Sequence, residues 1–121
     1  MPSKTKSHNQ QIGAWGEQAA TDWLTARGYE ILARNVRTPY GEIDIIARQS
    51  DMTVFVEVKT LTSSKDFFPE HQITPRKREH MFAAAEHYSA TNNIDHWQID
   101  VLAVEGKPGG RATITHFENA I

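Results

Sequence analysis

Two acidic residues and a lysine lie in neighbouring segments that read as one β-hairpin. Asp44 belongs to the first segment, whereas Glu57 and Lys59 belong to the second. Because side chains alternate along a strand, Glu57 and Lys59 share one face of the second strand. A turn centred on residues 50–51 would place Asp44 opposite Glu57, with Cβ atoms about 5 Å apart. The pattern therefore predicts two opposed carboxylates beside an ammonium group.

Opposed carboxylates carry a physical penalty that a bound cation would remove. Like charges in this position repel and destabilise a sheet. A divalent cation between Asp44 and Glu57 would turn the repulsion into attraction, and oxygen-only ligands favour a hard ion such as Mg²⁺ or Mn²⁺. The alternative is a solvated face on which Glu42 pairs with Lys59 across the strands. Residues 54–59 are otherwise apolar on both faces. Charges within that run are therefore expected to be half-buried, which favours the metal site.

A helix before the hairpin supplies a third acid. Its apolar residues recur at helical spacing: Ile12, Trp15, Ala19 and Trp23. Gly28 follows where a left-handed C-terminal cap is expected. Glu17 lies at the edge of the apolar stripe, from which it can lean toward the charged face of the hairpin. We therefore expect Glu17 near the two opposed carboxylates.

The remaining elements follow from caps and periodicity. Thr74 is expected to be the N-cap of a second helix, with Pro75 at its first position. In all, the pattern predicts helices over residues 12–27 and 74–91, and strands over residues 29–35, 42–48, 53–60, 97–104 and 112–117. The order α-β-β-β-α-β-β predicts an α/β or α+β domain, of which we favour α/β, with a central mixed β-sheet flanked by helices.

Length and composition limit the class of protein. The chain has 121 residues, which suits one domain over residues 12–121 preceded by a disordered polar tail over residues 1–11. It has no cysteine, so disulfides and thiolate metal sites are excluded. No apolar run approaches the ~20 residues that span a bilayer, and the start lacks the apolar segment of a secretory signal. We expect a cytoplasmic protein with no membrane partner.

Charge bears on nucleic-acid binding in two opposite ways. The net charge of −2 argues against binding by bulk electrostatics. Residues 76–78, Arg-Lys-Arg, would occupy the first turn of the second helix, where cations oppose the helix dipole. A phosphate bound there would reverse the sign of that interaction. Two interpretations therefore stay open: this helix start contacts DNA, with Lys77 as the preferred residue, or it is a solvated basic end.

Other candidates carry less chemistry. His80 and His87 would share a helix face, but no third ligand lies at suitable spacing, so zinc is not expected. Asp100 is expected to be a structural strand-end residue rather than a metal ligand, and His116 to lie on the surface or fill a polar gap. The loop aromatics Phe67 and Phe68 could stack on a base or form an oligomer contact.

The same residues carry a resemblance to a known family. The matching motifs are GEQAA at 16–20, GEIDIIA at 41–47, VFVEVKT at 54–60 and IDV at 99–101. With these motifs the chain resembles the YraN-like family of uncharacterised bacterial proteins over about residues 12–121. That family is similar to the PD-(D/E)xK nucleases, which include archaeal Holliday-junction resolvases. The resemblance implies a restriction-endonuclease-like fold.

The resemblance also implies roles for individual residues. Asp44 and Glu57 would be metal ligands, the carbonyl group of Val58 a third, and Glu17 an auxiliary ligand, directly or through water. Lys59 would orient or activate the attacking water. A cation and an ammonium group both stabilise charge that develops at phosphorus, so these roles agree with the reading of the hairpin.

Two departures from the family concern the surroundings of this site. Leu61 stands where the family often has arginine, and Val36 stands where a tryptophan is expected, although Arg37 remains. These changes leave the acidic residues intact and affect contacts to phosphate beside them.

Two functions are therefore weighed. The first is a Mg²⁺- or Mn²⁺-dependent endonuclease that hydrolyses DNA phosphodiester bonds, specific for branched DNA in repair or recombination and active as a homodimer. Its expected DNA contacts are Arg37, Arg76, Lys77 and Arg78. The alternative is a non-catalytic module that binds nucleic acid or a protein partner and retains a nuclease fold. The net charge and Leu61 support this alternative.

Overall fold

The computed structural model describes residues 7–61 and 73–121. Within these residues the elements are α1 (His8–Ala26), β1 (Glu30–Thr38), β2 (Gly41–Gln49), β3 (Met52–Leu61), α3 (Pro75–Thr91), β4 (Trp97–Glu105) and β5 (Thr113–Phe117). The strands form one sheet in the order β1-β2-β3-β4-β5, in which β3 and β4 are parallel and the other neighbours antiparallel. The predicted α/β class and element order are confirmed.

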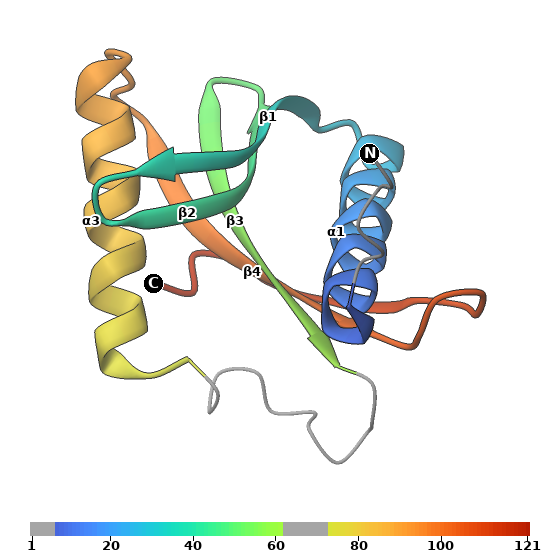
Figure 1. Ribbon diagram of the computed structural model, residues 1–121. Helices are drawn as coiled ribbons and strands as arrows, with labels where there is room; N and C mark the ends of the chain where they lie inside the picture. The colour runs from blue at the N-terminus through green and yellow to red at the C-terminus, as the bar shows by residue number, and fades with distance from the viewer. Residues whose placement is uncertain (1–6, 62–72) are drawn as a thin grey trace, which may run out of the picture.

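Each face of the sheet is covered by one helix, as Figure 1 shows. Below α1 the core includes Ala20, Leu24, Ile45, Val54, Val56 and Leu102. Below α3 it includes Ile46, Phe55, Ala84, Ala85 and Ile99. A strand that is buried on both faces carries apolar residues at successive positions, which accounts for the run at the centre of β3. On the hairpin face predicted to carry the charges, Ile46 and Phe55 are therefore covered by α3, whereas Glu42 is exposed.

The register of the central hairpin is the predicted one. Ladder pairs join residues 45–49 of β2 to residues 52–56 of β3 around a turn at residues 50–51. The ladder then stops. Asp44 and Glu57 are the next residues on their strands, so the two strands part where the two acids begin.

The first helix starts earlier than its apolar stripe indicates. Ser7 is the N-cap, and it forms a capping box in which its hydroxyl group accepts from the amide of Gln10 while the Gln10 side chain accepts from the Ser7 amide. The helix consequently begins at His8. Residues 8–11, which were expected to belong to a polar tail, are helical.

The first strand runs further than expected, to Thr38 instead of residue 35. Asn35 has a φ of 52° within the strand, and the register shifts between Ile31 and Ala33. A positive φ interrupts the alternation from which a strand is recognised, so the pattern ended at the irregularity and not at the end of the strand.

Helix α1 approaches β3 most closely at Gly16. A Cβ atom at this position would collide with the hydroxyl group of Thr60 and lie 3.0 Å from the Thr60 Cβ. Only glycine therefore allows this approach, which holds the neighbouring Glu17 against the sheet.

Two expectations concern regions away from this core. None of the helices in the described part of the chain is both long and apolar enough to cross a membrane. Phe67 and Phe68, for which base stacking or an oligomer contact was expected, lie outside the described residues.

Candidate active site

Asp44 lies at the centre of the acidic group, which consists of the interacting carboxyl groups of Asp44, Glu57 and Glu17. Its Oδ2 accepts a hydrogen bond from the backbone amide of Val58 at 2.9 Å, across the point where the ladder has ended. Burial, followed by the negative charge of Glu57, raises the pKa of Asp44 to about 7, although the Val58 amide and the Lys77 charge lower it. The two carboxyl groups therefore interact, as the predicted register requires, and the raised pKa leaves Asp44 partly protonated near neutral pH, so that a bound cation would displace the proton.

A change in the facing of β2 places Asp44 at this point. Ile43 packs in the core below α3, whereas Ile45, two residues later, packs in the core below α1. Residues two apart on a regular strand share a face, so the strand turns about its axis between them. Asp44 lies at the turn, between the two covered faces of the sheet.

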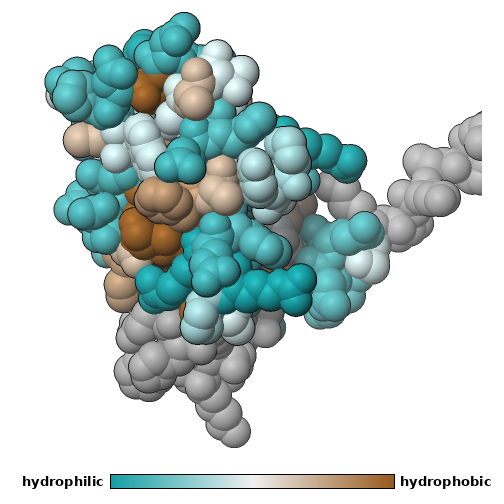
Figure 2. Space-filling view, turned by 90° about the vertical axis from the view of Figure 1, so that its left-hand side faces the viewer, coloured by the Kyte–Doolittle hydropathy of each residue, from teal (hydrophilic) through white to brown (hydrophobic). Residues whose placement is uncertain are grey.

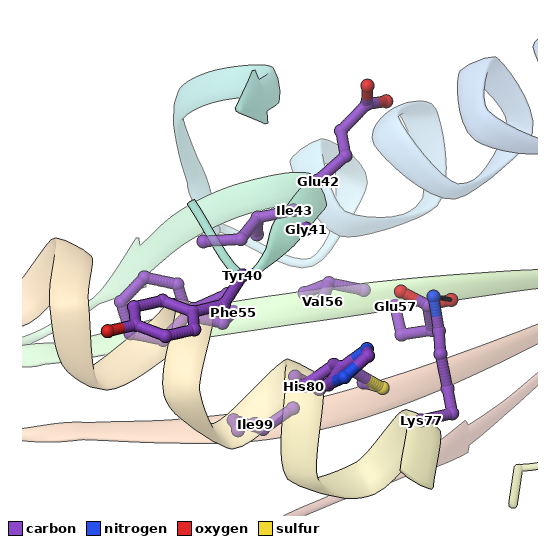
Figure 3. Close-up of a pocket in the computed structure, with 12 residues that line it drawn as sticks. Tyr40, Gly41, Glu42, Ile43, Phe55, Val56, Glu57, Lys77, His80 and Ile99 are labelled. Carbon is purple, nitrogen blue, oxygen red and sulfur yellow. Dashed lines mark ion pairs between the residues drawn. The ribbon is translucent and has the colours of Figure 1, made fainter. Parts of the chain in front are cut away.

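Glu57 is bound from the α3 side. Its Oε1 lies 3.3 Å from Nζ of Lys77, in the first turn of α3, and its side chain is 14% exposed compared with 49% for the lysine. Figure 3 shows the lysine extending from the helix toward the carboxylate. An ammonium group half in solvent beside a mostly buried carboxylate is placed to contact an anion that approaches the acids.

Glu17 approaches from the other helix. Its Oε1 is buried, has no hydrogen-bond donor and lies 3.6 Å from Nη2 of Arg34. Burial and the nearby charge of Asp44 raise its pKa, while the Asn35 side chain and Arg34 lower it. Although α1 covers the opposite face from α3, Glu17 belongs electrostatically to the same acidic group. A buried carboxylate oxygen without a donor is the kind of atom that a cation or its water would satisfy.

Lys59 and Glu42 are not brought together. Lys59 is partly buried on β3 and lies opposite Ala103 of the parallel neighbour β4. Glu42 lies opposite Arg37 of β1, and its carboxylate points away from the neighbouring pocket in Figure 3. The ladder ends before these two residues meet, so the alternative of a Glu42–Lys59 cross-strand ion pair is wrong.

The predicted nucleic-acid contacts lie on two elements, β1 and the first turn of α3. Arg37 and Arg76 are exposed on β1 and in the first turn of α3. Arg78 instead donates from Nη1 to the carbonyl group of Ala120 at 2.9 Å, and thereby fastens the end of the chain to α3. Lys77, the preferred DNA contact, lies at the acidic group, which leaves a smaller basic surface than the sequence indicated.

A pocket opens beside Glu57, and the sequence did not indicate it. It lies between α3 and the strands and offers about 460 Å³ of space, measured out to open solvent. Its wall includes Tyr40, Phe55, Glu57, His80 and Met81. The i, i+3, i+4 spacing of Lys77, His80 and Met81 on one helix face was the signal available in the sequence.

A second polar group lies below α1, at the far side of the sheet. Asp100 is fully buried, and its carboxylate contacts Gln98 Nε2 at 2.8 Å, His116 Nε2 at 2.7 Å and the Asn119 amide at 2.8 Å. Among the described residues, Asp100, His116 and Glu118 form the one group of three whose ligand atoms all lie within 4.8 Å of one another, so they could hold a metal ion. Their hydrogen bonds also give Asp100 a structural role, although it lies inside β4 and not at the end of the strand, as was expected.

Comparison with known proteins identifies the family. The model of the uncharacterised protein family UPF0102 matches residues 16–104. A UPF0102 protein of Syntrophotalea carbinolica is 40% identical over 111 residues, covering 90% of this chain and 89% of that one, and one of Treponema pallidum is 39% identical over 118 residues, covering 93% and 94%. Among solved structures, Pyrococcus furiosus SfsA in complex with Ca²⁺ is 15% identical with a TM-score of 0.37, covering 91% of this chain and 63% of that one, which is too distant to bear on function. UPF0102 is the YraN family, so the predicted family resemblance is confirmed, and the chain belongs to the uncharacterised protein family UPF0102.

Proposed function

We propose that this protein is a Mg²⁺- or Mn²⁺-dependent endonuclease that hydrolyses DNA phosphodiester bonds. The observation that carries the proposal is the pair Asp44–Glu57, two interacting carboxyl groups, one with its pKa raised to about 7, placed where β2 and β3 part. A sheet gains no stability from such a pair, whereas a hard divalent cation would be bound by it.

The residues present fit a cation of this kind. Asp44 and Glu57 would hold it. Glu17 could join them directly or through water, because its Oε1 is buried and accepts no hydrogen bond, with Nη2 of Arg34 3.6 Å away. The carbonyl group of Val58 is the further ligand that the family resemblance implies. The cation would supply positive charge against the negative charge that develops at phosphorus.

Two lysines complete the proposed chemistry from this chain. Lys77 faces solvent beside Glu57, and it would bind a non-bridging oxygen of the phosphate. Lys59, on the same strand face as Glu57, would orient the attacking water. Both ammonium groups would stabilise the transition state, in which the phosphate carries more negative charge than in the substrate.

The first experiment is a cleavage assay on labelled single-stranded, duplex, flap and four-way-junction DNA with Mg²⁺, Mn²⁺ or EDTA. We expect metal-dependent cleavage that Asp44→Asn, Glu57→Gln and Lys59→Ala each abolish. Glu30→Gln is the matched control, because Glu30 is an exposed strand acid paired with Arg48, away from the site. Cleavage in EDTA, or cleavage that survives Asp44→Asn, would refute the proposal. The substrate cut best tests the proposed preference for branched DNA.

One observation favours the non-catalytic alternative. The ion pair between Glu57 and Lys77 already satisfies a carboxylate that the metal would need. In a binding module this pair would only fasten α3 to β3. Titration calorimetry separates the two functions: the nuclease requires Mn²⁺ binding that Asp44→Asn removes, whereas the module binds DNA equally with or without Asp44.

The proposed homodimer can be tested on the four-way junction that the cleavage assay uses. Enzymes that cut both strands of a branched substrate symmetrically need two sites, so we propose that two copies assemble on the DNA. Sedimentation of the protein with and without a four-way junction tests this, and a single copy on the junction would contradict it.

A further inference from the structure

We propose that the pocket beside Glu57 binds a single unpaired nucleobase of the DNA strand whose phosphate lies at Asp44 and Glu57. This inference rests on the proposed function and names its substrate class: DNA with nucleotides free of base pairing. The pocket and the acidic group share Glu57, which interacts with Asp44 on one side and forms part of the pocket wall on the other.

The pocket has the chemistry of a small-molecule site, because apolar side chains form most of its wall and a few charged side chains lie at one end. Phe55, Ile43 and Met81 make its wall apolar, while Glu57 and Lys77 form its polar end, as Figure 3 shows for the labelled residues. A flat apolar base attached to a charged phosphate matches this division, because the phosphate would meet Lys77 while the base enters the apolar part.

The rim of the pocket carries an exposed aromatic ring. Tyr40 is 50% exposed at the tip of the β1–β2 hairpin, although a large hydrophobic side chain gains free energy from burial. The tip is held rigidly, since the Tyr40 amide donates to Thr38 Oγ1 at 3.1 Å and that hydroxyl group donates to the Gly41 carbonyl. A rigid, half-exposed ring beside a pocket is suited to stacking on an unpaired base.

The helix side of the pocket extends this surface. His80 of α3 is exposed and lines the pocket, and His87 makes an edge contact with the Tyr40 ring at 5.9 Å between centroids. Seen from the side of α3, Figure 2 shows apolar side chains gathered within a largely hydrophilic surface. Apolar and aromatic groups ringed by polar ones are typical of a binding surface.

Base pairing decides which DNA can use the pocket. A base within a duplex is stacked on its neighbours and bonded to its partner, so it must be unpaired and unstacked before it can enter. Nucleotides at a flap, at a junction or in a single strand are already free. The pocket would therefore select against continuous duplex without any contact that reads sequence.

Binding without cleavage tests the inference. Ca²⁺ replaces Mg²⁺, and the probe is single-stranded DNA carrying 2-aminopurine, a fluorescent base whose emission falls on stacking. We expect quenching with the single strand and none with the same strand in a duplex. Tyr40→Ala and His80→Ala should each weaken quenching, Tyr40→Ala by roughly tenfold in affinity, while Tyr40→Phe retains it. Phe82→Ala is the control, because Phe82 is an exposed aromatic residue of α3 outside the pocket wall.

The outcomes separate this inference from the proposed function. Absence of quenching, equal quenching by duplex, or equal loss with Phe82→Ala and Tyr40→Ala would overturn the pocket, even if the protein cleaves DNA in the assay above. Quenching that depends on Tyr40 in a protein that cleaves nothing would refute the nuclease and leave the base pocket standing. The melting temperature of each variant shows whether it is folded.

Discussion

The ammonium group of Lys77, in the first turn of α3, lies 3.3 Å from the carboxylate of Glu57 on β3. This contact joins a helix that covers one face of the sheet to the strand that carries the acidic pair. It also gives the acidic group a cation from the protein itself, which lowers the pKa of Asp44. Lys77 therefore competes with any cation at the site and attracts any anion there.

Removal of this lysine should change metal and DNA binding in opposite directions. In Lys77→Met, the loss of a like charge should tighten Mn²⁺ binding roughly threefold, a modest factor because the lysine is half exposed and screened by solvent. The affinity for single-stranded DNA should fall. Calorimetry with each ligand measures both changes. Lys107→Met, in the β4–β5 turn, is the control that should alter neither, and weaker Mn²⁺ binding in Lys77→Met would contradict this account.

Metal-free protein should lose stability as pH rises toward 7. Folded Asp44 keeps its proton up to about pH 7, whereas the unfolded chain loses it near pH ~4, so between these values the folded state binds more protons. The contribution of Asp44 to the free energy of unfolding therefore falls as pH rises, and it is lost completely above pH 7. Asp44→Asn does not titrate but still accepts from Val58. At pH 8 in EDTA it should be more stable than the wild type by roughly 2 kcal/mol, with little difference near pH 4.

Urea unfolding at several pH values measures this difference. Saturating Mn²⁺ should reverse the order at pH 8, because the cation binds only the folded wild-type protein. An Asp44→Asn variant that is less stable than the wild type in EDTA at pH 8 would show that the acidic pair is not under strain.

The features of the site that depend on residues close together in the sequence could be predicted, whereas those that depend on the packing of distant elements could not. The hairpin register depends on alternation and on a turn at residues 50–51, so the opposition of Asp44 and Glu57 was readable in the sequence. The start of α3 was equally readable, since Thr74 caps it and Pro75 follows. The capping box of Ser7 and Gln10 was present in the sequence but lies outside the apolar stripe, and the helix start was missed.

The contacts that complete the site depend on how helices dock. Lys77 meets Glu57 only because α3 lies over that face of β3, and no periodicity determines this placement. Glu17 was expected on the charged face, yet α1 covers the opposite one, and the two carboxylates interact because β2 turns at Asp44. Such long-range geometry comes from the packing of whole elements.

The close approach at Gly16 should be intolerant of a single methyl group. Gly16→Ala should destabilise the protein by about 1–3 kcal/mol, because the added Cβ collides with Thr60. In Gly16→Ala/Thr60→Ala, part of that loss should be recovered. Gly13→Ala, in the same helix with open space around the new Cβ, should instead stabilise by up to ~1 kcal/mol. Urea unfolding of the full cycle measures the coupling, and additive effects would contradict a direct contact.

The group around Asp100 should govern the attachment of the chain end. Asp100→Ala leaves the donors of Gln98, His116 and Asn119 without their buried acceptor, which should destabilise the protein by roughly 3 kcal/mol. Thermal unfolding measures the loss, and hydrogen exchange at the Asn119 amide should accelerate. Asp95→Ala, an exposed acid before β4, is the control. An unchanged melting temperature would leave a ligand role as the remaining explanation of this group.

The hydrogen bond between Asp44 and the Val58 amide also limits how this family can change over generations. A side chain at position 44 must offer an oxygen to an amide that the ended ladder leaves without a strand partner. Asparagine offers that oxygen without the charge, whereas alanine or leucine does not. In a relative that lacks the proposed metal chemistry but keeps this fold, asparagine is therefore the residue we expect at position 44.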